Sequence, residues 1–595
     1  MGVVGFLLST AVLSALAWVG AHAWVARGEL LQAQAGIADL RSQVAALDLA
    51  GLQPAYDDVR AHTAAARAHT DDPVWRLLEH VPLLGPNLTL TRELSAGTDD
   101  VLQAVEPAVE VAQGLDLASL GPQGGRLPVE VVERVAAVLP GVASDLSDVR
   151  ERLHATSESG SIAQLREART VVVDAVDTAT SALDAAAPVV AALPPVLGAD
   201  APRVYVVMFL NNAELRPLGG TALSFAEIHV DRGAISLGRV VPAVSPGFRQ
   251  HDAPVIPAPD GFDQIVPEGF GRYIANATLR PSDVTAAQIV QAEWRNVFGE
   301  EIDGVVAVDA GALAGIVGAI GPIPLSTGDV VAGDNLVSLL LNTVYTRYDS
   351  GNILADDAAQ GAVYAETVAQ TFGRLTGGGY DPVVLLQAAR TAADQRRLSV
   401  WLADPALQAA LEPLGMGARD LVVESTGTED VLGVYLNDRS GSKVSYYLGT
   451  DITKGSAVCT PDGRQVHRIT LTLANRLPAD AVPGLSRSVS GMRYAEFGLK
   501  KGELKLGTMF YIPPGATFLS ASLNGNPVPI TERHDTDRPV LPVDARLSPG
   551  DSATLTVDVL MGTPGARTLV TDVTPTADST LLHDAPLSCS EVALP

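Results

Sequence analysis

An uninterrupted apolar segment near the N-terminus, Val3 to Val25, contains no Asp, Glu, Lys or Arg. As an α-helix that rises 1.5 Å per residue, a segment of this length is roughly 34 Å long, enough to cross the ~30 Å hydrocarbon core of a bilayer. We therefore predict a single transmembrane anchor that precedes a large globular region outside the cytosol. A second interpretation stays open, because Ala21-His22-Ala23 matches the A-x-A pattern at which signal peptidase cleaves.

The composition of the chain limits its partners and its compartment. A formal charge of −27 over 595 residues argues against nucleic acid as a partner, because a phosphate backbone attracts surfaces rich in Lys and Arg. Cys459 and Cys589 are the only cysteines. We predict a disulfide between them, which would place the C-terminal region in an oxidising compartment; two unrelated thiols are the alternative.

Lysine is absent before Lys443, so nearly all positive charge is carried by arginine. This bias, together with abundant Ala and Val, is typical of a GC-rich bacterial genome, and we expect an actinobacterial source. An arginine at any one position is therefore weak evidence of a selected function.

Residues 28–200 are poor in aromatic residues and rich in helix-forming ones, which predicts an all-α stalk or bundle that continues from the anchor at residues 1–27. The three-and-four spacing of a coiled-coil seam or helical hairpin runs through Leu30, Ala33, Ile37, Leu40, Val44 and Leu47. Prolines such as Pro54 and Pro140 predict breaks between helices, and Pro194-Pro195 predict the end of the last one.

The pattern changes after residue 200. Arg203 to Asn211 is a nearly continuous run of apolar, β-branched and aromatic residues, typical of a buried central strand. Strands and helices alternate beyond it, with a helix expected at Ala310 to Ile320, so residues 201–415 predict an α/β domain. Short alternating strands with Pro/Gly turns predict an antiparallel β-sandwich at residues 416–595. The fold class is therefore multidomain α+β.

Well-known catalytic motifs are absent from the sequence, including G-x-S-x-G, H-E-x-x-H, Walker A and the Rossmann glycine pattern. Ser440 to Lys443 fits S-x-x-K, but no K-T-G or S-D-N segment accompanies it, and we interpret it as a turn. His251-Asp252 is interpreted as a surface pair.

Polar residues gather in three clusters of the α/β region. The first follows the predicted central strand, where open α/β sheets bind ligands, and it precedes the glycine pair Gly219-Gly220, which would let a ligand approach the backbone. The clusters consist of Asn211, Asn212, Glu214 and Arg216; of Arg272, Asn276, Arg280 and Asp283, with Asp283 as a helix N-cap; and of Tyr345, Arg347 and Asp349. Together they can bind a diphosphate and a divalent cation, whereas internal hydrogen-bond networks are the alternative.

Four segments resemble a family of bacterial envelope proteins, domain-of-unknown-function family four-zero-one-two, over about Leu30 to Gly562. These segments are FLNNAELRPLGG, RYIANATLRPSD, EIDGVVAVDAGALAGIVGAIGPIPL and GSKVSYYL. That family is distantly similar to the LytR-CpsA-Psr phosphotransferases over about Arg203 to Leu375. Those anchored enzymes move a glycopolymer from a polyprenyl pyrophosphate onto peptidoglycan with a magnesium ion.

The resemblance implies roles for several residues of the clusters. Glu214 would be a ligand of Mg²⁺, Arg216 and Arg347 would bind phosphate, and Asn276 resembles the asparagine of the K-I-N-A segment of the phosphotransferases. We add Asn211, Asn212 and Arg280 as ligand-binding candidates and Asp283 as the carboxylate that deprotonates the acceptor hydroxyl. The chain departs from the phosphotransferases at Gly220, at about Ala243 and at Ala359-Gln360, where one metal ligand and two arginines are missing.

Two classes of function remain. In both, the protein is attached to the cell membrane by one span and lies outside the cytosol. In the first, it binds a polyprenyl-(pyro)phosphate-linked or wall glycan and, if it is an enzyme, transfers a glycopolymer to the cell wall as a metal-dependent phosphotransferase. In the second, it is a non-catalytic envelope scaffold or interaction protein with a degenerate phosphotransferase-like head, which either binds wall glycan or a polyprenyl phosphate or acts only as a scaffold.

Overall fold

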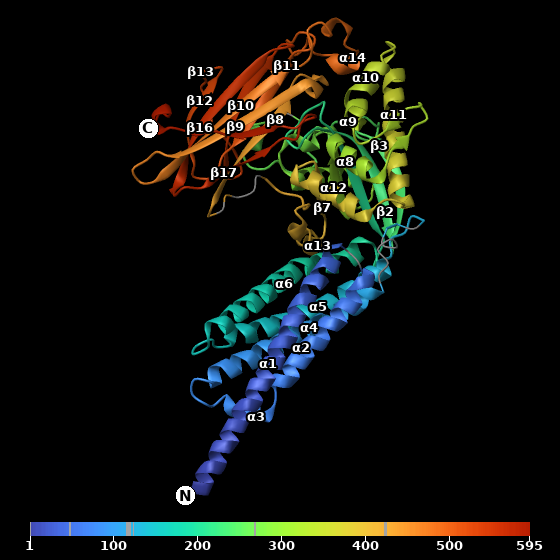
Figure 1. Cartoon of the computed structure of the whole chain (residues 1–595). Coiled ribbons are helices and arrows are strands. Elements are labelled where there is room, and N and C mark those ends of the chain that lie inside the picture. The colour runs from blue at the N-terminus through green and yellow to red at the C-terminus, as the bar shows by residue number, and fades with distance from the viewer. Residues whose placement is uncertain are drawn as a thin grey trace. The chain divides into compact units, whose positions relative to one another are not determined.

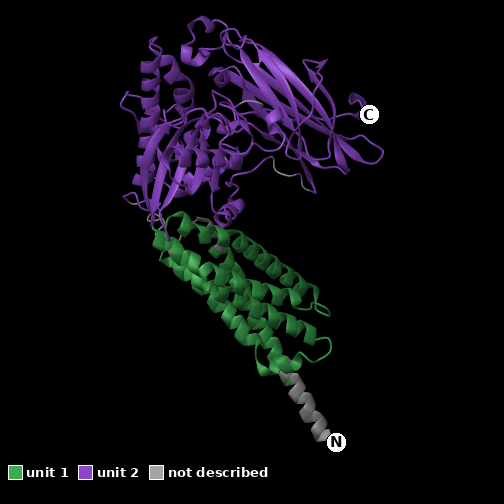
Figure 2. Cartoon of the chain, turned by 180° about the vertical axis from the view of Figure 1, so that it is seen from behind, with its two compact units in different colours: residues 1–120, 128–199 green, residues 121–127, 200–595 purple. Residues whose placement is uncertain are grey.

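The computed structural model describes residues 2–46, 49–114, 121–122, 124–266, 269–421, 425 and 427–594; the side chains of residues 2–13, 15–16, 41, 44–46 and 49–50 lie outside the described part. The chain divides into two compact units (Figure 2). Unit 1 comprises residues 1–120 and 128–199, and unit 2 comprises residues 121–127 and 200–595. The predicted domain ranges within these units stay predictions.

Unit 1 is made of helices (Figure 1). They are α1 (Gly2–Ala46), α2 (Leu49–Thr70), α3 (Pro73–Leu78), α4 (Gly85–Gln113), α5 (Val129–Ala155) and α6 (Ala163–Val196). Pro54 and Pro140 lie inside α2 and α5, and Pro194 and Pro195 lie in the last turn of α6. The prediction that Pro54 and Pro140 break the helical region was therefore wrong, because packing in a bundle can offset the hydrogen bond that a proline removes. The predicted end of the last helix at Pro194-Pro195 is confirmed, since α6 ends at Val196.

The hydrophobic stripe predicted at the start of the helical region packs as a helical hairpin would. Ala33, with Ile37 and Leu40 beside it, lies against Tyr56 and Val59 of α2. Val44 and Leu47 of the same stripe fall outside the described side chains. A second core joins α4, α5 and α6 through Leu90, Leu94, Val149, Leu153, Val173 and Val176.

Among the described residues, α6 is the one helix whose length and hydropathy would allow it to cross a membrane. Its Val173 and Val176 are buried in the core shared with α4 and α5, as expected of a bundle helix. The predicted anchor, Val3 to Val25, lies in the first half of α1, but most of its side chains lie outside the described part.

The first sheet of unit 2 has the strand order β3-β2-β1-β4-β7. Its strands are β1 (Arg203–Asn211), β2 (Thr221–Asp231), β3 (Ala234–Pro242), β4 (Gly304–Asp309) and β7 (Leu398–Leu402). β1 is central, antiparallel to β2 and parallel to β4, which confirms the predicted central strand. The other pairs, β2 with β3 and β4 with β7, are antiparallel.

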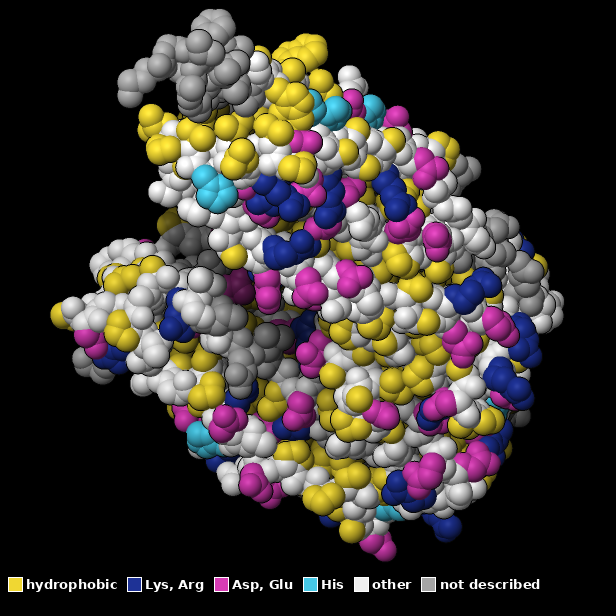
Figure 3. Space-filling view, turned by 90° about the horizontal axis from the view of Figure 1, so that it is seen from below, with side chains coloured by type: hydrophobic (Ala, Val, Ile, Leu, Met, Phe, Trp, Pro, Cys, Tyr) yellow, Lys and Arg dark blue, Asp and Glu magenta, His cyan; other side chains and the backbone are white. Residues whose placement is uncertain are grey.

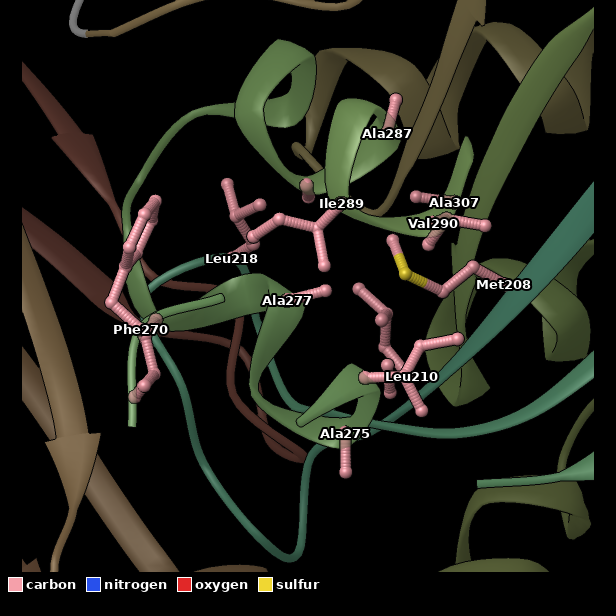
Figure 4. Close-up of a cluster of buried hydrophobic side chains, with 14 of the residues drawn as sticks. Met208, Leu210, Leu218, Phe270, Ala275, Ala277, Ala287, Ile289, Val290 and Ala307 are labelled. Atoms are coloured by element: carbon pink, nitrogen blue, oxygen red, sulfur yellow. The ribbon is translucent and has the colours of Figure 1, made fainter. Parts of the chain in front are cut away.

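The side chains of β1 alternate between two cores, as the period of a strand requires. Met208 and Leu210 pack with Ile289 and Val290 of α7 (Asp283–Phe298) on one face (Figure 4). On the other face, Val207 and Phe209 pack against the core that contains α8 (Ala310–Ile320), the helix predicted at those residues. The side chain of Ser282, not of Asp283, caps α7, since Ser282 Oγ accepts a hydrogen bond from Thr285 N (3.0 Å).

Further helices of unit 2 are α9 (Leu336–Ser338), α10 (Val344–Arg347), α11 (Ile353–Gly377), α12 (Pro382–Asp394), α13 (Pro405–Ala409) and α14 (Arg487–Ser490). A π-helical turn, Leu339–Thr343, joins α9 to α10. A short hairpin pairs β5 (Ile323–Pro324) with β6 (Val330–Val331).

The C-terminal region is rich in strands, as predicted. One sheet has the order β14-β15-β11-β8-β17 and the other β13-β12-β16-β10-β9-β18. The first contains β8 (Glu429–Asp438), β11 (Leu504–Tyr511), β14 (Arg533–Asp535), β15 (Arg538–Leu547) and β17 (Thr568–Val573); the second contains β9 (Leu448–Val458), β10 (Arg464–Asn475), β12 (Thr517–Leu523), β13 (Asn526–Pro527), β16 (Ser552–Pro564) and β18 (Leu581–Asp584). One core, which includes Leu436, Leu471, Phe510 and Leu555, contains residues of both sheets. The edge strand β17 pairs in parallel with β8, and the edge strand β18 pairs in parallel with β9. The sandwich is therefore not wholly antiparallel.

The predicted disulfide is present. Cys459 lies directly after β9, and Cys589 lies in the short helix that follows β18, 130 residues further along the chain. The bond therefore ties the C-terminal segment to the end of β9.

Reduction of this disulfide is expected to lower the melting temperature of the protein. Closing a loop of this length restricts the unfolded chain, which contributes about 2–4 kcal/mol to the free energy of unfolding. Thermal unfolding with and without dithiothreitol measures the effect. A Cys459→Ser/Cys589→Ser variant is the control, because it should melt like the reduced protein and no longer respond to the reductant; equal melting temperatures in all samples would contradict the prediction.

Candidate functional site

The turn between β1 and β2 carries the first polar cluster and is closed by its own hydrogen bonds. Asn211 Oδ1 accepts a hydrogen bond from Ala213 N (3.0 Å), and Asn211 Nδ2 donates one to Tyr345 Oη (3.0 Å). Gly219 has a φ of +111°, and a Cβ atom on Gly220 would overlap with the backbone of Asn211. The space left by Gly220 is therefore used by the chain's own backbone.

Asn212 is completely buried and joins separate segments of unit 2. Its Nδ2 lies 2.9 Å from Asp309 Oδ2, 2.9 Å from Gly219 O and 3.2 Å from Pro575 O. Arg397 Nη1 donates to the same Asp309 oxygen at 2.6 Å. The amide of Asn212 thus belongs to an internal network.

Glu214 forms an ion pair with Lys443, which lies between β8 and β9. The Lys443 Nζ atom also lies 4.6 Å from the centre of the Tyr345 ring, a cation–π arrangement. Burial lowers the pKa of Lys443 to about 8, whereas the neighbouring carboxylate favours the charged ammonium. Lys443 is the functional candidate that the sequence argument missed, although it stands in the segment GSKVSYYL.

The surroundings of Glu214 do not fit the predicted Mg²⁺ site. Magnesium requires several oxygen ligands in octahedral geometry, but the ionic partner of Glu214 is an ammonium group. The described residues include no group of three or more His, Cys, Asp or Glu side chains able to hold a metal ion. A bound cation would have to displace Lys443, and the role of Mg²⁺ stays a prediction.

Arg216 binds the end of β8 through backbone and side-chain oxygens. Its Nη1 atom lies 2.7 Å from Asp438 O, 3.1 Å from Leu215 O and 3.3 Å from Asn437 Oδ1. Burial lowers the pKa of the Arg216 guanidinium. This residue therefore connects the β1–β2 turn to the strand-rich region.

Arg280 makes a similar connection at another place. Its Nε and Nη2 atoms donate to Asp535 at 2.9–3.1 Å, and its Nη1 donates to Thr285 Oγ1 (2.6 Å) and Asp420 Oδ1 (3.0 Å). Tyr511 Oη donates to Asp535 Oδ2 at 2.9 Å. Arg280 is 3% exposed and Asp535 is 0% exposed, so this ion pair is buried.

Two other predicted residues lie in separate surroundings. Asn276 is half-buried in the 3₁₀ segment Ile274–Leu279, near Gly269. Asp283 accepts hydrogen bonds from Ser399 Oγ (3.0 Å) and Arg419 N (3.3 Å). Among the contacts of the described residues, none joins Asp283 to Glu214 or Arg216.

Arg347 forms an ion pair with Asp329. The carboxylate raises the pKa of Arg347, and the guanidinium lowers the pKa of Asp329 to about 2. It follows Tyr345 by two residues, which is about 200° around a helix of 3.6 residues per turn. Since Tyr345 faces Asn211 and Lys443, Arg347 points away from them.

A polar cavity of about 210 Å³ lies beside Lys443. Its lining combines carboxylates, an amide, a hydroxyl, two cations and apolar groups: Asp349, Ile353, Asp356, Asp357, Gln360, Gly441, Lys443, Arg487, Ser488, Gly491 and Met492. Gln360 Nε2 donates to Ser488 Oγ at 3.0 Å, and Arg487 N donates to Asp349 Oδ1 at 3.3 Å. The start of α11 and the segment around α14 therefore form its walls.

Comparison with known proteins identifies the part of unit 2 that contains the β1–β2 turn. Residues 200–345 match the family described as "protein of unknown function (DUF4012)". This segment is similar to the DUF4012 family. The match confirms the family resemblance of the segments around Asn211 and Asn276, and it says nothing of the phosphotransferases.

Other comparisons add little to the DUF4012 assignment. No curated protein matches the sequence. A crystal structure from Legionella pneumophila subsp. pneumophila str. Philadelphia 1, of a protein described as a candidate nutrient-binding protein, has 10% identity and a TM-score of 0.15 over 23% of this chain and 44% of that one. The chain thus matches less than half of that protein, and the likeness carries no argument.

An Arg280→Ala substitution is expected to lower the free energy of unfolding by about 3–5 kcal/mol. The reason is that Asp535 would be left as an unpaired buried charge. Urea unfolding followed by tryptophan fluorescence measures the change. Arg295→Ala is the matched control, because its ion pair with Glu301 is exposed and should matter little; equal effects of both substitutions would contradict the structural role of Arg280.

Proposed function

We propose that this DUF4012 protein is a membrane-anchored, extracytoplasmic envelope protein that binds a wall glycan, or the glycan part of a polyprenyl-linked precursor, without transferring it. The observation that carries this proposal is the polar cavity beside Lys443. Sugar hydroxyls both donate and accept hydrogen bonds. The lining provides acceptors in Asp357 and donors in Arg487, with Gln360 and Ser488 able to do both.

The charge of the cavity favours a glycan over a phosphate. Three carboxylates, from Asp349, Asp356 and Asp357, face two cations, Lys443 and Arg487. Phosphate groups are usually bound by an excess of Arg and Lys. A neutral or amino-substituted sugar fits this balance better than a pyrophosphate does.

The arginines expected to bind a pyrophosphate are engaged within the protein. Arg216 donates to the carbonyl of Asp438, and Arg280 donates to Asp535. A phosphate at either arginine would have to break buried hydrogen bonds, and leaving such groups unpaired costs about 1–3 kcal/mol each. The internal hydrogen bonds of these two arginines therefore support the non-catalytic alternative.

Side chains near the predicted anchor support attachment to a membrane. Trp24, Leu77 and Leu83 are 75%, 71% and 87% exposed. Trp75 is buried with Val19 and Leu88, which holds α3 beside the part of α1 that ends the predicted span. Figure 3 shows hydrophobic side chains gathered on this face of the molecule. Tryptophan is enriched at membrane–water interfaces, so these residues suit the edge of a bilayer.

The disulfide supports a location outside the cytosol, because such bonds persist in oxidising compartments.

A distant similarity of the region around the sheet β3-β2-β1-β4-β7 to the LytR-CpsA-Psr phosphotransferases remains part of the proposal. It rests on the sequence segments alone. Glycopolymer transfer is the competing outcome in the binding experiment described next.

Asp357→Ala and Arg487→Ala are each expected to weaken binding of solubilised wall polysaccharide by about tenfold or more, equivalent to about 1.4 kcal/mol. Isothermal titration calorimetry with the full-length protein measures the affinity. Asp480→Ala, an exposed carboxylate outside the cavity, is the control. Unchanged affinity in both cavity variants would sink the proposal, and release of polyprenyl phosphate from a labelled lipid-linked glycan with Mg²⁺ would establish transfer instead.

The full-length protein is expected to stay in the membrane fraction after extraction with alkaline carbonate. A variant that lacks residues 3–25 should move to the soluble fraction, because it loses the predicted span. Sequencing of the mature N-terminus is the second measurement. A chain that begins at Trp24 would show cleavage after Ala23 and contradict the anchor.

A further inference from the structure

Three side chains of the strand-rich region form a continuous hydrogen-bonded series. Ser456 Oγ lies 2.7 Å from His467 Nδ1, and His467 Nε2 lies 2.9 Å from Asp430 Oδ2. His467 is 0% exposed and Asp430 is 1% exposed, whereas Ser456 is partly exposed. A hydroxyl, an imidazole and a carboxylate in this order are the parts of a Ser-His-Asp triad, which is recognised by geometry rather than by sequence order.

The strand pairing explains how these residues meet. Ser456 of β9 and His467 of β10 are direct partners in the antiparallel ladder, so their side chains leave the sheet on the same face. Asp430 belongs to β8 of the other sheet and faces them across the sandwich. Arg567 Nη1 donates to the second oxygen of Asp430 at 3.2 Å, which holds the carboxylate in place.

Ser456 is accessible from a cavity. This cavity has a volume of about 220 Å³, and its lining includes Lys454, Ser456, Arg567, Thr568 and Asp584. Lys454 Nζ donates to Leu569 O at 2.8 Å, so its ammonium group is fixed beside β17. The hydroxyl thus faces a space lined by two cations and by the carboxylate of Asp584, which lies 3.6 Å from Lys454 Nζ, while the imidazole lies behind it in the interior.

We propose that Ser456, His467 and Asp430 form a catalytic triad that hydrolyses short-chain carboxylic esters. This activity is separate from the proposed glycan binding and does not depend on it. The cavity of about 220 Å³ has room for a short acyl group. Lys454 and Arg567 line the cavity, and positive charge there would stabilise the carbonyl oxygen as it becomes negative.

The reaction has two steps. Ser456 Oγ forms a bond to the ester carbonyl carbon and passes its proton to His467 Nδ1; the carbon–oxygen bond to the alcohol then breaks, and the alcohol leaves with that proton. Water attacks the acyl-serine and gives a proton to His467, which returns it to Ser456 Oγ as the carboxylic acid leaves. The sum is ester plus water to acid plus alcohol.

The surroundings of His467 suit a general base. Burial lowers its pKa, so the imidazole is neutral near pH 7. When Nε2–H donates to Asp430, the Nδ1 atom keeps the lone pair that accepts the Ser456 proton. Asp430 is a positioning residue that selects this tautomer.

A fluorophosphonate probe tests the proposal on the full-length protein. Ser456 Oγ should displace fluoride from phosphorus, with the serine proton and fluoride leaving together, and peptide mapping by mass spectrometry should find the adduct on Ser456. Ser456→Ala should lower labelling and p-nitrophenyl acetate hydrolysis by roughly a hundredfold or more. Ser552→Ala is the matched control, since Ser552 is an exposed serine of β16 outside the cavity.

Melting curves establish whether each variant is folded. His467→Gln should also abolish labelling while Ser456 is still present, because glutamine can donate to Asp430 but cannot act as a base. Mapping on the unaltered chain decides the question even if both variants unfold. An adduct elsewhere, no adduct at all, or equal labelling of native and heat-denatured protein would overturn the triad.

Discussion

A buried ion pair between Arg280 and Asp535 joins two parts of unit 2, the sheet that contains β1 and the strand-rich C-terminal region. Arg280 lies just before α7 beside the central sheet, and Asp535 ends β14 of the strand-rich region. Each group needs the other, because a buried charge without a partner is strongly destabilising. Arg216 adds a second connection through the carbonyl of Asp438. The central sheet and the sandwich therefore behave as one compact unit.

This requirement changes the interpretation of the polar residues that follow β1. Such residues suggest a ligand site when only the sheet is considered, since ligands bind at the ends of central strands. In this protein Asn212 and Arg216 instead bind segments that come hundreds of residues later, at Pro575 and Asp438. The residues of unit 2 that we propose a ligand reaches are instead Lys443 and the other residues that line the neighbouring cavity.

Local patterns were enough to predict much of the fold. Arg203–Asn211 and Ala310–Ile320 were expected at their observed bounds, because a run of β-branched residues and a helical period are local properties. Proline positions misled the prediction at Pro54 and Pro140, since tertiary packing can override a local helix preference. Local sequence patterns cannot predict the ion pair between Glu214 and Lys443, because these two residues are 229 positions apart in the sequence.

The sequence by itself determined the order of helical and strand-rich regions, the central strand, the DUF4012 segment around Asn211 and Asn276, and the two cysteines that form the disulfide. Tertiary structure decided which polar groups have partners and which face a cavity. Ser456, His467 and Asp430 meet because β9 pairs with β10 and both face β8 across the sandwich. Strand register and sheet packing set these distances, and neither follows from residue spacing along the chain.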